Sequence, residues 1–101
     1  MKESKMKKII SGTEARKLIE SHGAVLVDVR NPPEFASGTA PGATNIPVNS
    51  IPQMAKEHDT DKHLIVFCLS GARSSMAHMI LDSMGYKNVS NVGTLQNFVN
   101  S

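Results

Sequence analysis

Residues 64–74 read Leu-Ile-Val-Phe-Cys-Leu-Ser-Gly-Ala-Arg-Ser and contain the clearest structural signals of the chain. Its apolar first part predicts a buried central strand over 63–67. Cys68, the only cysteine among the 101 residues, ends that strand, and a short polar loop leads from it to a helix. A packed cysteine usually lies inside a strand or on the apolar face of a helix. Because Cys68 is instead followed by flexible and polar residues, we predict that its thiol is reactive.

The loop after Cys68 has the properties of an anion site. A helix N-terminus leaves backbone N–H groups unpaired and carries about half a positive charge. Gly71 lets the backbone curl so that successive N–H groups point inward. Arg73 adds a permanent positive charge, and both effects should lower the thiol pKa below its ordinary value of about 8.5. We expect the following residues to hold the sulfur: Leu69, Ser70, Gly71, Ala72, Arg73 and Ser74.

The first half of the chain alternates helix and strand signals. Residues 11–14, Ser-Gly-Thr-Glu, form a capping box that predicts a helix through Ile19, with Gly23 as its stop. The apolar run 24–29 predicts a parallel strand covered on both faces. Residues 31–34, Asn-Pro-Pro-Glu, repeat the capping pattern and predict a short helix.

The second half continues the alternation. The segment 38–47 is expected to be mostly loop with a brief strand at 44–46, and 51–57 to form a short helix. The helix after the cysteine loop is expected to begin at Ser74 as N-cap and to stop at Gly85. Helical spacing predicts a buried face made of Met76, Ala77, Ile80, Leu81 and Met84. The opposite, solvent-facing side would carry Ser75, His78 and Asp82.

These elements predict an α/β fold in which a small parallel β-sheet has helices on both faces. Folds of this kind bind ligands at the carboxyl ends of their strands. Cys68 lies at such an end. The sequence therefore places the candidate site where the fold favours one.

Composition indicates one small domain. With 101 residues, 40% of them hydrophobic, the chain can bury one core, which we assign to residues 9–101. Residues 1–8 carry four lysines and are expected to form a disordered basic arm. No apolar stretch approaches the about 20 residues that span a bilayer, and no signal-peptide core follows the lysines. We therefore expect a cytoplasmic protein without a membrane partner.

Charge and residue types exclude further classes. A net charge of +2 and 4% aromatic residues argue against nucleic-acid binding. One cysteine cannot form an internal disulfide or a cysteine-rich metal site. The histidines lack the close paired spacing of a zinc site; they lie at positions 22, 58, 63 and 78. We expect no metal and no cofactor.

Five segments in order carry a family resemblance. They are Val25-Leu26-Val27-Asp28-Val29-Arg30, Asn31-Pro32-Pro33-Glu34-Phe35, Gly38-Thr39-Ala40-Pro41-Gly42-Ala43-Thr44-Asn45-Ile46-Pro47, the loop Cys68-x-x-Gly71-x-Arg73-Ser74, and Gly85-Tyr86-x-Asn88-Val89. From about residue 9 to residue 99 the chain resembles a single-domain rhodanese, a sulfurtransferase fold. It departs from the family pattern at Thr39-Ala40, where His-Ile is usual, and at Phe98, which occupies the place of a tryptophan.

The resemblance implies a sulfurtransferase. Cys68 would take the outer sulfur of a donor such as thiosulfate, hold it as a persulfide, and pass it to cyanide or to a thiol, protein thiols included. Arg73 would either neutralise an anionic donor or brace the loop. Asp28 and Arg30 are expected to lock neighbouring loops by an ion pair. Glu34 is first a capping residue, although the family often places this carboxylate near the cysteine loop. We expect a monomer.

Two other functions stay open. Dual-specificity phosphatases and arsenate reductases also place a cysteine at a helix N-terminus, but they have one residue more between cysteine and arginine than the Leu-Ser-Gly-Ala found between Cys68 and Arg73. The shorter cradle favours sulfur over phosphate. A non-catalytic rhodanese-like module for binding or sulfur relay is disfavoured by the intact cysteine.

Overall fold

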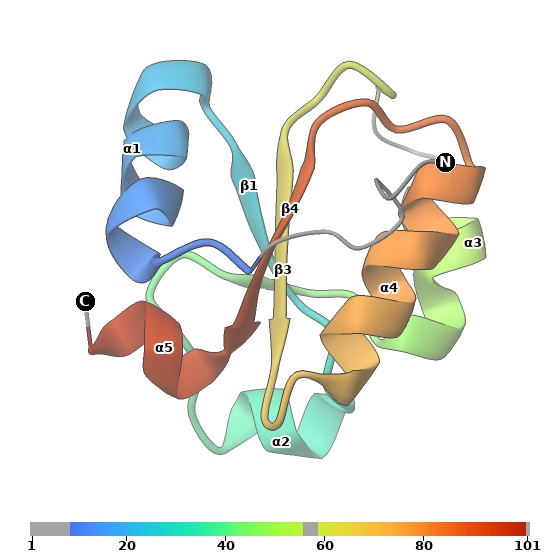
Figure 1. Ribbon diagram of the computed structural model, residues 1–101. Helices are drawn as coiled ribbons and strands as arrows, with labels where there is room; N and C mark the ends of the chain where they lie inside the picture. The colour runs from blue at the N-terminus through green and yellow to red at the C-terminus, as the bar shows by residue number, and fades with distance from the viewer. Residues whose placement is uncertain (1–8, 56–58, 101) are drawn as a thin grey trace.

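The computed structural model describes residues 9–55 and 59–100 (Figure 1). The expected basic arm at 1–8, the end of the helix expected over 51–57, and His58 lie outside the described residues. None of the helices in the described part of the chain is long and apolar enough to cross a membrane.

Four parallel strands form one sheet in the order β2-β1-β3-β4. Their bounds are β1 Val25–Asp28, β2 Thr44–Asn45, β3 Leu64–Cys68 and β4 Val89–Thr94. All five residues of β3 are buried because β1 and β4 flank it and helices cover both faces. The predicted small parallel α/β sheet, with the strand before Cys68 at its centre, is confirmed.

Helices cover the two faces of the sheet in two groups (Figure 1). One group is α1 (Gly12–His22) with α5 (Leu95–Val99), and the other is α4 (Ala72–Ser83) with α3 (Ile51–Met54), which follows the 3₁₀ turn η2 (Val48–Ser50). The short α2 (Pro32–Ala36) lies across the carboxyl ends of the strands. The site therefore lies where α2 meets the end of β3.

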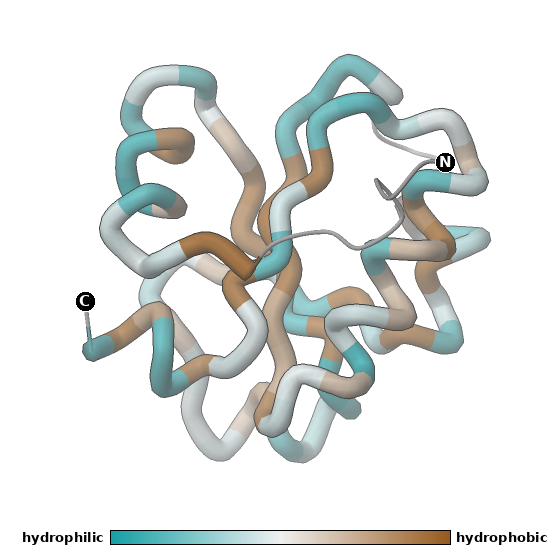
Figure 2. The backbone as a smooth tube through the Cα atoms, viewed as in Figure 1, coloured by the Kyte–Doolittle hydropathy of each residue, from teal (hydrophilic) through white to brown (hydrophobic). Residues whose placement is uncertain are grey.

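Successive residues of β3 point to opposite faces and feed two apolar cores. Leu64, Val66 and Cys68 belong to the core beneath α3 and α4, while Ile65 and Phe67 belong to the core beneath α1 and α5. The hydrophobic stretches of the backbone accordingly meet at the centre of the molecule (Figure 2). This alternation places Cys68 on the α4 side of the sheet.

The capping patterns begin helices where expected. The Ser11 hydroxyl accepts a hydrogen bond from the Glu14 backbone N–H at 3.0 Å, and the Glu14 carboxylate accepts one from the Ser11 N–H at 3.0 Å. Helix α1 continues to His22 and ends at Gly23, which has φ 63°, a conformation that favours glycine. At α2 the Glu34 carboxylate accepts from the Asn31 N–H at 3.0 Å. Both predicted helices are confirmed.

The predicted faces of α4 are partly wrong. Met76, expected in the core, is 55% exposed, whereas His78, expected in solvent, is only 5% exposed. Ser74 is not the N-cap, because Gly71 occupies that position and Ser74 lies buried within the first turn. The physical reason lies in the contacts of Ser74, which set the rotation of the helix about its axis.

Candidate active site

Cys68 ends β3 fully buried, with its sulfur enclosed by the loop that follows. The backbone N–H of Gly71 donates to Cys68 Sγ at 2.9 Å, and the N–H of Ser74 donates to the same atom at 3.4 Å. Gly71 has φ 99°, a left-handed conformation that side-chain-bearing residues rarely adopt. The glycine thus provides the turn that directs both N–H groups at the sulfur.

The Ser74 side chain fastens the first turn of α4 to the sheet. Its hydroxyl lies 3.0 Å from the Gly71 carbonyl oxygen and 3.2 Å from the Gly93 carbonyl oxygen on β4. The single hydroxyl proton is shared between these two carbonyl acceptors, so the serine holds the loop close to the neighbouring strand. Ser74 therefore supports the sulfur cradle with its backbone and positions the helix with its side chain.

Opposing effects act on the Cys68 thiol. Burial raises its pKa because a thiolate is poorly solvated in the core. Hydrogen bonds from the backbone N–H and the hydroxyl of Ser74, and from the N–H groups of Gly71 and Arg73, stabilise the thiolate and lower the pKa. The hydrogen bonds prevail, and the pKa of Cys68 lies below its ordinary value. Backbone amides favour an anion at this sulfur.

Arg73 reaches from α4 to α2 and forms a two-pronged ion pair. Its Nη1 donates to Glu34 Oε1 at 2.7 Å and its Nη2 to Glu34 Oε2 at 3.1 Å. The hydrogen bonds from Arg73, together with the one from the Asn31 N–H, lower the pKa of Glu34 from 4.5 to about 2. About a third of each side chain is exposed. In this geometry Arg73 braces the cysteine loop against α2.

A second ion pair is almost completely buried just after the end of β1. Arg30 Nη2 donates to Asp28 Oδ2 at 2.7 Å, and Arg30 Nε lies 3.0 and 3.1 Å from the two carboxylate oxygens. The same guanidinium donates to the Gly38 carbonyl at 2.7 Å. The hydrogen bonds with Asp28 raise the pKa of Arg30. The expected pairing of these residues is thus present, and it holds the loop after α2.

Sequence reasoning missed two polar residues that complete this lock. The Thr39 hydroxyl donates to Asp28 Oδ2 at 2.8 Å. The Asn45 side-chain amide donates to the carbonyls of Asp28 and Arg30, both at 2.9 Å. Thr39 is one of the departures noted from the family pattern. Eleven positions separate Thr39 from Asp28, so no local sequence signal indicated that the two side chains meet.

An open hollow of about 540 Å³ adjoins the cysteine loop. It is lined by uncharged residues: Ile9, Ser70, Gly71, Ser75, Val92, Gly93, Thr94 and Asn97. Ser70 and Gly71 are thus shared between the wall of the hollow and the loop around Cys68 Sγ. Over residues 9–55 and 59–100, no group of three or more His, Cys, Asp or Glu side chains is placed to hold a metal ion.

The central strand of this parallel α/β sheet ends in a buried cysteine, and amides at a helix N-terminus surround its sulfur. These features define a class of proteins that hold an anionic sulfur. The family model described as a rhodanese-like domain matches residues 11–99. The chain belongs to the rhodanese-like family, as the sequence resemblance implied.

Named relatives are sulfurtransferases. The chain is 36% identical over 84 residues to a sulfurtransferase of Allochromatium vinosum, covering 83% of this chain and 78% of the relative. It is 34% identical over 96 residues to the human thiosulfate:glutathione sulfurtransferase, covering 81% of this chain and 84% of the relative.

Solved structures agree with the assignment of the chain to the rhodanese-like family. A human single-domain sulfurtransferase superposes with a TM-score of 0.78 at 30% identity, covering 92% of this chain and 96% of the other. An Escherichia coli rhodanese, described as containing anions, gives a TM-score of 0.68 at 33% identity, with coverage of 73% and 89%. Fold and family are therefore established together.

Proposed function

We propose that this protein transfers a sulfane sulfur from thiosulfate, or a similar small donor, to a thiol or cyanide through a persulfide on Cys68. The observation that carries the proposal is the pair of backbone N–H groups, from Gly71 and Ser74, aimed at Cys68 Sγ. They lower the pKa of the thiol and so favour the nucleophilic thiolate over the neutral thiol. The names of the relatives support thiosulfate as donor.

The first half-reaction forms the persulfide. The Cys68 thiolate attacks the outer sulfur of thiosulfate, the S–S bond of the donor breaks, and sulfite leaves with the bonding electron pair. The product carries its negative charge on the terminal sulfur. Because the loop already surrounds Cys68 Sγ with fixed N–H groups, we expect its amides to stabilise the charge that moves to the terminal sulfur.

The second half-reaction releases the sulfur. An acceptor thiolate or cyanide attacks the terminal sulfur, the bond to Cys68 Sγ breaks, and the Cys68 thiolate is restored. The acceptor leaves as a persulfide or as thiocyanate. A thiol is the acceptor expected in a reducing compartment such as the cytoplasm.

Arg73 acts in this proposal as a positioning residue. Its two terminal nitrogens are engaged by Glu34, so its main effect is to hold the cysteine loop against α2. Its charge also lies near Cys68 and offsets part of the charge of a dianionic donor. The short loop favours sulfur chemistry over the hydrolysis of phosphate esters.

The test is an intact mass after brief treatment with thiosulfate. We expect a gain of one sulfur atom that dithiothreitol reverses, that cyanide discharges as thiocyanate, and that the Cys68→Ala variant lacks. Circular dichroism should show that Cys68→Ala is folded, since the change removes one small buried group. Absence of the mass gain in the parent protein, or an equal gain in Cys68→Ala, would refute the proposal. p-Nitrophenyl phosphate, offered in parallel, should not be hydrolysed.

A further inference from the structure

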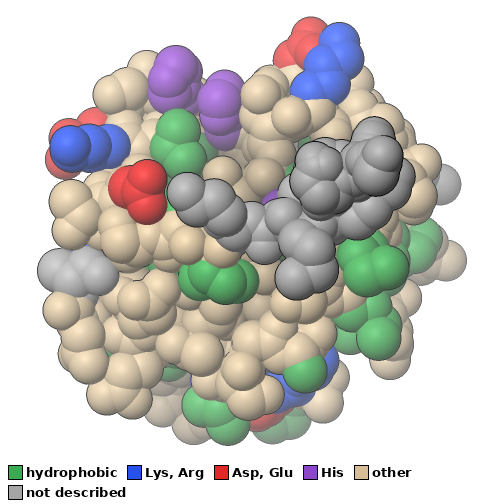
Figure 3. All heavy atoms as spheres, viewed as in Figure 1, with side chains coloured by type: hydrophobic (Ala, Val, Ile, Leu, Met, Phe, Trp, Pro, Cys, Tyr) green, Lys and Arg blue, Asp and Glu red, His purple; other side chains and the backbone are tan. Residues whose placement is uncertain are grey.

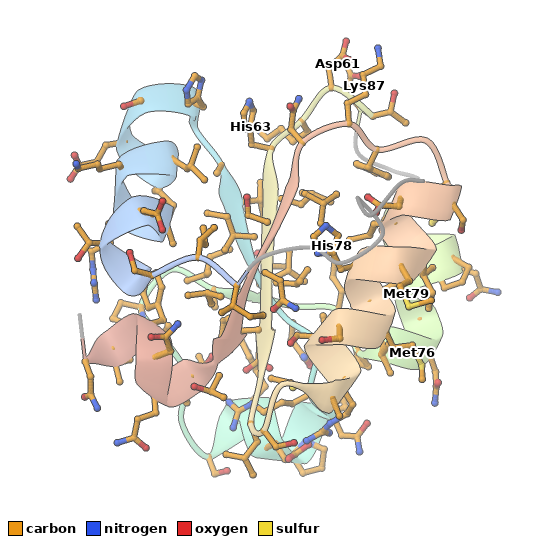
Figure 4. The ribbon with its side chains drawn as sticks, in the orientation of Figure 1. Asp61, His63, Met76, His78, Met79 and Lys87 are labelled. Carbon is orange, nitrogen blue, oxygen red and sulfur yellow. The ribbon has the colours of Figure 1, made fainter. Side chains whose placement is uncertain are left out.

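The outward face of α4 carries exposed apolar side chains in its first two turns, with Ser75 beside them and Asp82 one turn after Met79. Met76 and Met79 lie one turn apart on this face and are 55% and 71% exposed. Figure 4 shows both side chains on the side of the helix that faces away from the sheet. Ala72 lies on the same face one turn before Met76, and Leu69, in the cysteine loop, is 59% exposed. We call these four residues the α4 strip: Leu69, Ala72, Met76 and Met79.

The rotation of α4 explains why methionines face solvent. Ser74 must face inward because its N–H donates to Cys68 Sγ and its hydroxyl reaches the Gly93 carbonyl. Helical spacing then turns inward the residues three, four and seven positions later, which are Ala77, His78 and Leu81, and all three are buried. The contacts of the cysteine loop therefore expose Met76 and Met79.

An apolar strip of this kind indicates a binding surface. The solvent face of a surface helix ordinarily carries charged or polar residues. Methionine is unbranched and polarizable, so it adapts to differently shaped partners and is frequent at surfaces that bind several ligands. Figure 3 shows hydrophobic side chains gathered on the side of the molecule where α3 and α4 lie. Isolated exposed apolar residues are common, but Ala72, Met76 and Met79 follow one another at helical spacing in the helix that begins at the cysteine loop.

The size of the strip limits its occupant. It exposes on the order of a few hundred Å², well below the about 800 Å² per partner of a stable protein complex. Ala72 and Met79 are separated by about 10 Å along the helix axis at 1.5 Å per residue. An extended peptide covers that length with about three residues. A short apolar peptide segment, bound transiently, fits these dimensions better than a second folded subunit.

The position of the strip specifies which peptide. Leu69 directly follows Cys68, and Ala72 begins the helix whose first turn contributes an N–H to the sulfur cradle. A segment lying on the strip would therefore hold a residue a few positions away near the mouth of the loop. We propose that the α4 strip docks an apolar segment of an acceptor protein whose cysteine, three to five residues away, receives the sulfur from Cys68.

This inference rests on the proposed function, whose second half-reaction it specifies. The acceptor thiolate attacks the terminal sulfur of the Cys68 persulfide, the bond to Cys68 Sγ breaks, and the acceptor cysteine becomes the persulfide. Cys68 returns as a thiolate, and no further oxidant or reductant is required. Cyanide and dithiothreitol react without the strip because they are too small to contact both the strip and the sulfur.

Synthetic acceptors test the docking. The probes are acetyl-Leu-Leu-Gly-Gly-Cys-amide and its reversed order, each paired with a peptide in which serines replace the leucines. We expect the parent protein to use a leucine peptide with a kcat/KM about tenfold higher than its serine counterpart, the ratio that one well-packed apolar contact supplies. The double variant Met76→Gln/Met79→Gln should reduce this ratio to about one while leaving transfer to cyanide unchanged.

A matched control comes from the opposite face of the sheet. Val99, on α5, is also an exposed apolar helix residue, at 45% exposure, and lies away from α4 (Figure 1). The Val99→Gln variant should keep the parent preference for leucine. Equal use of leucine and serine peptides by the parent protein, in both orders, would overturn the docking proposal. A preference that survives in the double variant would overturn it as well.

A binding measurement separates this proposal from the proposed function. The probes are the same peptides with serine in place of cysteine, and the readout is the NMR shift of methyl-labelled Met76 and Met79. Shifts caused by the leucine peptide and not by the serine peptide would support docking even if no persulfide forms. Persulfide formation without such shifts would leave the proposed function standing and refute docking. Sedimentation showing a dimer that Met76→Gln/Met79→Gln dissociates would assign the strip to a second copy and likewise refute it.

Discussion

The two ends of the sheet hold their charges in different ways. At the carboxyl ends of the strands, the pair of Asp28 and Arg30 is almost completely buried, and the pair of Glu34 and Arg73 is about two thirds buried. At the amino ends, Asp61 and Lys87 lie 3.3 Å apart with about seven tenths of each side chain exposed. Figure 4 shows this exposed pair at the end of the molecule where His63 lies.

The difference follows from solvent. Water screens an exposed ion pair, so its attraction contributes little to stability. A buried ion pair interacts strongly, and removing one partner leaves the other as an uncompensated buried charge. The charges that matter structurally are thus concentrated at the end of the sheet that holds Cys68. Three substitutions test this contrast, and a fourth tests the turn that directs amides at Cys68.

The largest effect is expected at Asp28. Asp28→Asn removes the charge but keeps the shape, which leaves the buried Arg30 guanidinium without its counter-ion. Loss of one partner of a buried pair costs about 3–5 kcal/mol. Urea unfolding should show a destabilisation of this size. A change as small as that of an exposed pair would mean that Arg30 finds sufficient partners in the Gly38 carbonyl and solvent.

Compared with Asp28→Asn, Gly71→Ala is expected to cause a smaller loss of stability and a larger loss of sulfur-transfer activity. The residue has φ 99°, where a Cβ adds strain of about 1–2 kcal/mol. No neighbouring atom lies within 4 Å of the added carbon, so the effect is conformational rather than a clash. If the loop relaxes, the Gly71 N–H leaves Cys68 Sγ and the thiol pKa rises. Ultraviolet titration of the thiolate should detect the rise; an unchanged pKa would show that the other N–H groups suffice.

Glu34→Gln should have an intermediate effect with a distinctive pH dependence. The pKa of Glu34 is about 2, below its ordinary 4.5, so the carboxylate contributes stability that is present above about pH 4.5 and is lost as the pH falls through about 2. The stability difference between parent and variant should therefore be constant at neutral pH and shrink across that acidic range. Several-fold weaker sulfur transfer should accompany it, because Arg73 no longer braces the loop. A pH-independent difference would contradict the assigned ion pair.

The smallest effect is expected at Lys87. Lys87→Gln breaks the exposed pair with Asp61, and surface changes of this kind alter stability by less than about 0.5 kcal/mol. Urea unfolding should not distinguish the variant from the parent. A loss comparable to that of Asp28→Asn would remove the contrast between the two ends of the sheet.

Local signals predicted most of the backbone. The capping residues at 11–14 and 31–34 and the stop at Gly23 act through neighbours in sequence, so they could be read directly and the structure confirms them. The buried strand that ends at Cys68 could also be predicted from the sequence, because its residues are apolar on both faces. The loop around the sulfur belongs to the same category, since its glycine and its helix start are adjacent along the chain.

The orientation of α4 could not be predicted in this way. Hydrophobic periodicity placed Met76 inside and His78 outside, yet the structure has the reverse. The deciding contact joins the Ser74 hydroxyl to the Gly93 carbonyl, 19 positions later in the chain. Thr39 beside Asp28 is a similar case. Contacts between distant segments leave no periodic signal, and here a polar contact outweighs the apolar pattern.

Cys68 has no second thiol within these 101 residues to act as a resolving cysteine. In the proposed cycle, a loaded sulfur therefore cannot be discharged by an internal disulfide, as it is in proteins with paired cysteines. The sulfur is released only when an outside nucleophile reaches it. The lifetime of the persulfide form therefore increases as the concentration of acceptors falls. The protein is thus suited to act as a reservoir as well as a catalyst.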